Sequence, residues 1–406
     1  MKIGLLTYHA VCNFGANLQA LSTVSYWRNR GHDPIFINWV TEELDNHYRR
    51  ITPDAQYNEH ENFRKKYFPM TRRCITDNDI ANVIREEGIE AVVIGSDAVM
   101  QTRPLRARIA FPTREIITIS KPSRDLICPN PFWGSFVHLL DKRIPICYMS
   151  ASCQNSKFRS SNLKEKEEAR ALLSQFSYIS TRDDWTAKQV SWFTDGKLTP
   201  PVTPDPVFAF NLNVKTQPSE QEIRERFNLQ GKYCLFSFHS DSAVSQKWLQ
   251  EIQYRMKERG VMCVALPFPQ GMEFHHPFNK EIKLPLSPLD WYAIIKYANY
   301  YIGDNMHPIV VCLHNAVPCF SFDQYATVKF HFIVNSRSSK VYHILKQFGY
   351  PENRVSLKGL YRMPSVDYVL QKLDLFDKEH VRTVAANYVD DYLKMMQNIE
   401  SIISNN

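Results

Sequence analysis

The stretch from Tyr300 to Asp323 limits this chain to an α/β architecture. Its sequence, YYIGDNMHPIVVCLHNAVPCFSFD, predicts a buried strand, a tight turn, a short helix and a second buried strand. Parallel strands need a helical crossover of this kind, because a tight turn cannot join them. Pro308 fits the first turn of the helix, and either Asp304 or Asn305 is a suitable N-cap.

His307 occupies the turn of this segment. A helix N-terminus at the carboxyl end of a parallel strand attracts anions, because its free N–H groups and its dipole face the crevice. A titratable imidazole beside such a site is expected for proton transfer to a phosphorylated substrate. The alternative is that His307 only caps the helix or makes a structural hydrogen bond, and its position alone does not separate the two.

Strands and helices alternate along the rest of the chain. A strand at 2–8, a helix and a strand at 33–39 predict a βαβ unit, and a proline-rich segment at 198–207 predicts a domain boundary. We therefore expect two Rossmann-like, doubly wound α/β domains facing a cleft, at residues 1–200 and 201–365. Residues 366–406 are expected to form helices that pack back on the first domain.

Residues 98–135 break the alternation. They contain several prolines and five arginines: Arg103, Arg106, Arg108, Arg114 and Arg124. We expect an insertion or long loop near the cleft, which either contacts an acceptor substrate or is a solvated surface excursion.

Two strand ends of the first domain carry small polar motifs. Asn13 and Gly15 lie in a turn that lacks both the G-x-G-x-x-G fingerprint and the Walker lysine, so nucleotide binding by those routes is unsupported. The turn either contacts a ligand or simply joins strand to helix. At the other strand end, Ser96 and Asp97 offer a hydroxyl and a carboxylate. Asp97 either caps the next helix or orients and deprotonates a substrate hydroxyl.

Three basic residues are candidates for holding an anion. Arg182 follows a short apolar strand, and its guanidinium suits phosphate or carboxylate; the alternative is a structural ion pair with Asp183. Arg337 and Lys340 precede or begin a helix, where positive charge is unfavourable for the dipole unless an anion is present.

No zinc spacing of histidines and cysteines and no C-x-x-C pair occurs, so we expect no metal. His314 lies two helical turns after His307 and is expected to be a core or helix-end residue. The net charge of +7 favours anionic partners but is too dispersed to indicate nucleic acid. Apolar cysteines, no signal peptide and no membrane-spanning run predict a cytoplasmic protein, with peripheral membrane association left open.

In order and spacing, the motifs resemble the polysaccharide pyruvyl transferase family. The resemblance runs from Lys2 to about Gly349 and implies a fold similar to GT-B glycosyltransferases. The matching elements are Asn13-Phe14-Gly15, Val92–Asp97, Ile179–Asp183, Asp205–Phe208, Trp291, His307 and Val317-Pro318.

The resemblance implies phosphoenolpyruvate as donor, held mainly by the second domain, and no other cofactor. The acceptor, on the side of the first domain, would be a sugar of a surface polysaccharide or its lipid-linked precursor, and the product a pyruvate ketal. His307 matches the family histidine as general acid, and Arg182 matches the family arginine. Asn13, Gly15, Ser96, Asn305, Arg337 and Lys340 are expected to bind substrates, with Asp97 beside His307 in catalysis.

The chain departs from the family pattern next to the histidine. Many members carry arginine where this chain has Asn305, and Pro308 replaces a small residue. Arg337 or Lys340 would then supply the missing phosphate contact. Two other functions stay open: a GT-B glycosyltransferase that uses a nucleotide sugar, and a non-catalytic subunit of polysaccharide assembly.

Overall fold

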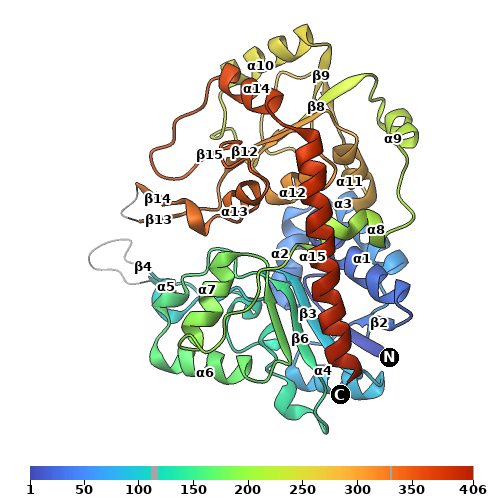
Figure 1. The fold of residues 1–406 in the computed structure, drawn as a ribbon, viewed down its shortest axis with the longest axis vertical. Coiled ribbons are helices and arrows are strands. Elements are labelled where there is room, and N and C mark those ends of the chain that lie inside the picture. Colours follow the sequence, from blue (N-terminus) through green and yellow to red (C-terminus); the bar gives the residue numbers. More distant parts are fainter. Residues whose placement is uncertain (111–117, 330–331, 406) are drawn as a thin grey trace.

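The computed structural model describes residues 1–110, 118–329 and 332–405. It contains two α/β domains, one above the other in Figure 1. The first has a five-stranded sheet in the order β2-β1-β3-β6-β7, with every neighbouring pair parallel. Its strands are β1 (Lys2–Leu6), β2 (Asp33–Phe36), β3 (Ala91–Asp97), β6 (Ile146–Ala151) and β7 (Tyr178–Thr181).

The second domain has a six-stranded parallel sheet in the order β10-β9-β8-β11-β12-β15. Its strands are β8 (Lys232–Ser237), β9 (Val261–Ala265), β10 (Lys280–Glu281), β11 (Tyr300–Gly303), β12 (Cys319–Asp323) and β15 (Arg354–Ser356). The predicted fold class, two Rossmann-like domains built on parallel sheets, is confirmed.

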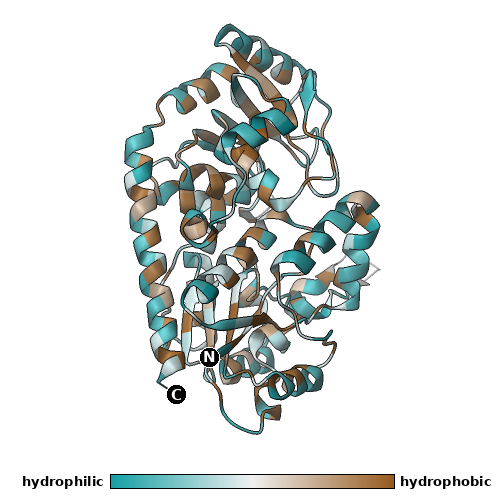
Figure 2. Ribbon diagram, turned by 90° about the vertical axis from the view of Figure 1, so that its right-hand side faces the viewer, coloured by the Kyte–Doolittle hydropathy of each residue, from teal (hydrophilic) through white to brown (hydrophobic). Residues whose placement is uncertain are grey.

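Helices cover both faces of each sheet, and Figure 2 shows their hydrophilic sides turned outward. Side-chain caps start many of them, as with Asn13 and Asp183, which accept bonds from Ala16 N and Thr186 N. The first domain contains α1 (Phe14–Asn29), α2 (Glu42–Ile51), α3 (Asp54–Tyr67), α4 (Asp77–Glu86), α6 (Leu163–Leu173) and α7 (Asp184–Phe193). The second contains α9 (Glu220–Phe227), α10 (Gln246–Glu258), α11 (Pro288–Lys296), α12 (Met306–His314), α13 (Lys340–Gln347) and α14 (Val366–Asp374).

The described residues of the segment 98–135, which are 98–110 and 118–135, contain regular structure. They include α5 (Leu105–Arg108), the antiparallel pair β4 (Ile109–Ala110) and β5 (Thr118–Ile119), and short 3-10 turns. Phe132 and Trp133 are buried in the core of the first domain, since their large apolar surface favours burial. Arg114 lies outside the described residues.

One hydrophobic cluster crosses between the domains. It runs from α1 and β1 through η5 (Pro206–Ala209) and α8 (Phe210–Asn213) into α11 and α12, and each domain also has a cluster of its own. Phe14 stacks on Trp291 across the interface, with ring centroids 5.2 Å apart. Gln56 exchanges two hydrogen bonds with the backbone of Leu286, at 2.8 and 2.7 Å.

The last helix, α15 (Lys378–Ser404), runs along both domains (Figure 1). Near its start, Tyr388 packs against Phe348 of the second domain. Further on, Met395 contacts the hydroxyls of Ser150 and Ser180 in the first domain. No helix in the described ranges combines the length and apolarity needed to span a bilayer.

Candidate active site between the domains

The Arg182 guanidinium lies buried at the end of β7, with 5% of the residue exposed. Its Nη1 donates to Asp205 Oδ2 at 2.8 Å. Its Nε and Nη2 are buried and have no hydrogen-bond partner among the described residues. Since an unsatisfied buried donor of this kind costs free energy, the two nitrogens favour an anion with two oxygens.

Asp205 orients this arginine. Its carboxylate also accepts bonds from Gln19 Nε2 of α1, at 2.5 Å, and from the backbone N–H of Val207, at 3.0 Å. Burial opposes the charge on Arg182, but the carboxylates of Asp205, Asp97 and Asp183 outweigh it and raise the pKa of the guanidinium.

The alternative of an Arg182–Asp183 ion pair is wrong. Asp183 is the N-cap of α7 and accepts from the backbone N–H and the hydroxyl of Thr186, both at 2.8 Å. The salt bridge of Arg182 is made with Asp205, because the backbone turn that begins α7 commits the Asp183 carboxylate to capping.

Lys340, the first residue of α13, is the second cation of the site. Ser339 caps that helix and donates its hydroxyl to Asp323 at the end of β12, so the sheet fixes where α13 starts. The Lys340 ammonium lies 4.3 Å from the centre of the Tyr325 ring. Burial, with the charge of Arg182, lowers the pKa of Lys340 to about 8, against the carboxylates of Asp97, Asp183 and Asp205.

His307 lies in the first turn of α12, with 7% exposed. Its Nε2 is buried and has no hydrogen-bond partner in the described part of the chain. Burial lowers the pKa of His307 to about 4; Asp97 and Asp205 oppose the shift, whereas Lys340 and Arg182 add to it. These four charged groups therefore all influence the charge of the imidazole.

Gly15, in the first turn of α1, lies against the His307 ring. A Cβ atom at this glycine would stand 2.0 Å from the ring's Cγ. The turn after β1 thus approaches His307 from the first domain. Asn13, in the same turn, uses its side chain to cap α1.

Ser96 and Asp97, which are adjacent in the sequence, differ in their burial and in their hydrogen bonds. Ser96 is 1% exposed and donates its hydroxyl to the carbonyl of Ser150, inside the sheet. Asp97 is half-buried and accepts from the N–H of Ala98 at 2.8 Å. Its φ of 87° lies in the region that favours glycine, and such strained residues cluster at functional sites.

Asn305 and Arg337 lie at the margins. Asn305 occupies the N-cap position of α12 without a capping bond from its side chain, and accepts from the Tyr325 hydroxyl at 3.2 Å. Arg337 is exposed in the 3-10 turn η6 (Ser336–Ser338). Of the two cations expected to replace the family arginine, Lys340 is therefore the buried one.

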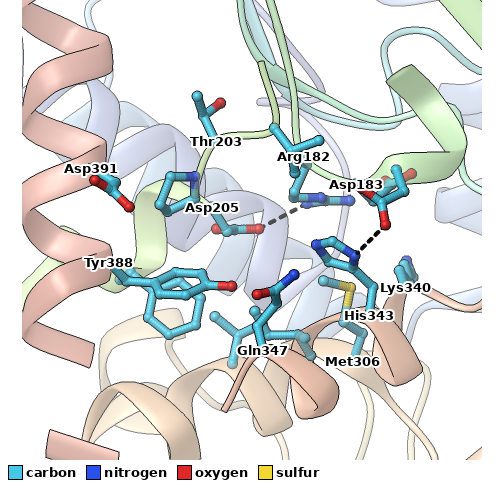
Figure 3. Close-up of a pocket in the computed structure, with 16 residues that line it drawn as sticks. Arg182, Asp183, Thr203, Asp205, Met306, Lys340, His343, Gln347, Tyr388 and Asp391 are labelled. Atoms are coloured by element: carbon cyan, nitrogen blue, oxygen red, sulfur yellow. Dashed lines mark hydrogen bonds and ion pairs between the residues drawn. The ribbon is translucent and has the colours of Figure 1, made fainter. Parts of the chain in front are cut away.

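Two cavities are lined by residues at the start of α12. Figure 3 shows the first, with Arg182 and Asp205 facing Lys340 and Met306. The second is lined by Asn13, Gly15, His239, Asn305 and His307. Neither is lined by a described residue of 98–135.

In the described ranges, no group of three or more histidines, cysteines or acidic residues is placed to hold a metal.

Among solved structures, the chain is similar to UDP-N-acetylglucosamine 2-epimerase from Rickettsia bellii. The identity is 11%, covering 100% of this chain and 97% of that chain, with a TM-score of 0.51. UDP-GlcNAc 2-epimerase from Methanocaldococcus jannaschii gives 11% identity over 95% of this chain and 99% of that chain, with a TM-score of 0.50. This similarity defines a protein of the GT-B fold class.

The chain belongs to the polysaccharide pyruvyl transferase family, whose model matches residues 13–324. The predicted family is thus confirmed, and with it a transferase of polysaccharide biosynthesis. A search of curated proteins finds no match.

Several site residues were not among the sequence candidates. Asp205 was visible only as part of the Asp-Pro-Val-Phe element of the resemblance, and nothing in the sequence pairs it with Arg182. Gln19 and Tyr325 carry no local signal, since each acts through a contact made by the tertiary fold.

Proposed function

We propose that the protein transfers pyruvate from phosphoenolpyruvate to two hydroxyls of a polysaccharide sugar, forming a ketal and releasing phosphate. The observation that carries this proposal is the pair of buried cations, Arg182 and Lys340, contributed by different domains to one cavity that Met306, the neighbour of His307, also lines. Phosphoenolpyruvate carries a phosphate and a carboxylate, which match two cationic groups.

An anion bound here would supply hydrogen-bond partners to buried polar groups that otherwise lack them. The free Nε and Nη2 of Arg182 gain partners, and each charged hydrogen bond contributes about 1.5–3 kcal/mol. The N–H groups at the start of α12 add a favourable dipole.

His307 is the proposed general acid. Its pKa of about 4 leaves it neutral at pH 7 in the free protein. The negative charge of phosphoenolpyruvate reverses that balance, because a nearby anion favours the imidazolium. His307 therefore takes up a proton from solvent when the donor binds, and this proton is the one that the reaction needs.

In the proposed reaction, His307 protonates the methylene carbon of the donor, giving an oxocarbenium-like centre at C2. One sugar hydroxyl attacks C2 and loses its proton, with Asp97 orienting it. The second hydroxyl then displaces phosphate, which leaves with the bridging oxygen and takes up the second proton. One hydroxyl proton thus balances the new methyl group and the other the released phosphate.

Free thiols support a cytoplasmic location: all nine cysteines are unpaired. The acceptor would be a sugar or lipid-linked oligosaccharide, and work at the inner face of the membrane would suit the latter.

The test is phosphate release from phosphoenolpyruvate with a panel of p-nitrophenyl glycosides. We expect acceptor-dependent release that falls about 10²–10⁴-fold in His307→Ala, the range for loss of a general acid. His314→Leu, at the other end of α12, is the matched control and should keep the wild-type rate.

Two outcomes would overturn the proposal. A folded His307→Ala variant with wild-type turnover would show that His307 is not the general acid. Nucleotide release that depends on a sugar nucleotide, without use of phosphoenolpyruvate, would indicate a glycosyltransferase instead.

A further inference from the structure

A histidine that is paired with an aspartate lines the second cavity, which adjoins the anion-binding one at the start of α12. His239 follows β8, and Asp304 directly follows β11, the neighbouring parallel strand. His239 Nδ1 lies 2.8 Å from Asp304 Oδ1, and the backbone N–H of His239 donates to Asp304 Oδ2 at 2.9 Å. The carboxylate therefore fixes both the backbone and the ring.

This geometry defines the state of the imidazole. An ionised carboxylate only accepts hydrogen bonds, so Nδ1 carries a proton, and in the neutral ring this tautomer leaves the lone pair on Nε2. The ring stacks on Phe268 with centroids 3.8 Å apart. Asp304 is 2% exposed, whereas the His239 side chain is 37% exposed.

His239 and His307 line the same cavity from different strand ends of the second domain. The remaining lining suits a sugar, since it combines aromatic faces with hydroxyl, amide and carboxylate groups. These come from α2 of the first domain and from the loop after β9; they include Tyr48, Phe268, Gln270 and Glu273.

We propose that this cavity binds the acceptor sugar and that His239, oriented by Asp304, is the base that deprotonates its attacking hydroxyl. The inference rests on the proposed pyruvyl transfer. His239 Nε2 takes the hydroxyl proton as the sugar oxygen bonds to C2, while His307 gives its proton to the methylene carbon. Solvent exchange then returns each histidine to its starting state. His239 is thus a catalytic residue and Asp304 a positioning residue.

The surface offers a matched control. His275 Nδ1 lies 2.7 Å from Asp241 Oδ2, a pair of the same chemistry with the His275 side chain 88% exposed and outside the cavity lining. His239→Gln and His275→Gln therefore remove the same group from two similar pairs, only one of which faces the cavity.

The test measures single-turnover phosphate release with phosphoenolpyruvate and the glycoside panel, together with phosphoenolpyruvate affinity by calorimetry. His239→Gln should lower the rate at least about 100-fold, as for loss of a general base, with the donor Kd within about twofold of wild type. Asp304→Asn should lower kcat about tenfold or more, as for loss of an orienting partner, and leave the KM of the donor unchanged. His275→Gln should match wild type.

Chemical rescue adds an independent readout. Imidazole should restore part of the rate to His239→Ala, because the deleted ring leaves space in an open cavity, and should not affect His275→Ala. A wild-type rate in folded His239→Gln, or a tenfold loss of donor affinity, would overturn the role of His239. No release by the wild-type protein with any glycoside would instead overturn the proposed function itself.

Discussion

Gly15 of the first domain lies directly against the imidazole of His307 of the second, so close that a Cβ atom would stand 2.0 Å from the ring's Cγ. Real side chains do not approach so closely. A glycine at this point of α1 therefore lets the two domains meet at the candidate acid.

Gly15→Ala should displace His307 and lower the rate of phosphate release. A misplacement of about 1 Å in an active site can cost about 100-fold, and overpacking typically destabilises by about 1–3 kcal/mol. Release assays and urea unfolding measure the two effects. In the His307→Ala background the same substitution should cost far less stability, because the ring is absent. Equal costs in both backgrounds would show that the clash is relieved elsewhere.

Donor binding should take up protons. The pKa values of His307 and Lys340, about 4 and about 8 in the free protein, both rise when an anion enters. The binding enthalpy measured at pH 7.5 should therefore change with the ionisation enthalpy of the buffer. Affinity should fall as the pH rises through about 8, where Lys340 loses its charge. Lys340→Met should bind weakly and without that fall; an unchanged wild-type affinity from pH 7 to 9 would contradict the assignment.

Asp205→Ala should destabilise the protein more than Arg182→Met. Removing the carboxylate leaves a buried guanidinium without its salt bridge, which typically costs about 3–5 kcal/mol. Removing the arginine leaves Asp205 with Gln19 and the N–H of Val207. Denaturant unfolding measures both. Inorganic phosphate should stabilise the wild type more than Arg182→Met, and the reverse order would argue against an anion site here.

Stability should fall in mild acid. Burial lowers the pKa of His9 and His307 to about 4, and of His60 and His314 to about 3. Below about pH 6.5 the unfolded chain binds protons that the folded chain does not, so each group removes up to about 1.4 kcal/mol per pH unit. The loss continues until the pH reaches the folded-state values.

His314→Leu isolates one such contribution. Both ring nitrogens of His314 are buried without a hydrogen-bond partner among the described residues, so leucine forfeits no bond. The variant should be at least as stable as wild type at pH 7.5 and lose less stability between pH 6.5 and 5 in urea unfolding. An unchanged pH dependence would show that His314 is accessible to protons in the folded state.

The periodic parts of the fold were predictable from the sequence. Buried strands such as Ala91–Asp97 and crossover helices such as Met306–His314 carry strong local patterns. The regular structure in the described parts of 98–135 was not predictable, because Phe132 and Trp133 lie among prolines and arginines without a period. Their burial depends on the core they enter.

The candidate site likewise has a part that the sequence predicts and a part that it does not. Arg182, His307 and Lys340 stand at strand or helix ends, where topology alone indicates a crevice. The Arg182–Asp205 pair joins residues 23 positions apart, and the His239–Asp304 pair joins residues 65 apart. Such distant pairings depend on strand order, which one sequence does not reveal.

The long helix α15 makes the interdomain site a single mechanical unit. Its first half is held by Phe348 and its second half by the strands that carry Ser150 and Ser180. Rotating one domain against the other would bend this helix or break the contacts of one of its halves. The spacing between Arg182 and Lys340 is therefore set before any ligand arrives. Bringing the two cations together then adds little to the free-energy cost of binding an anion.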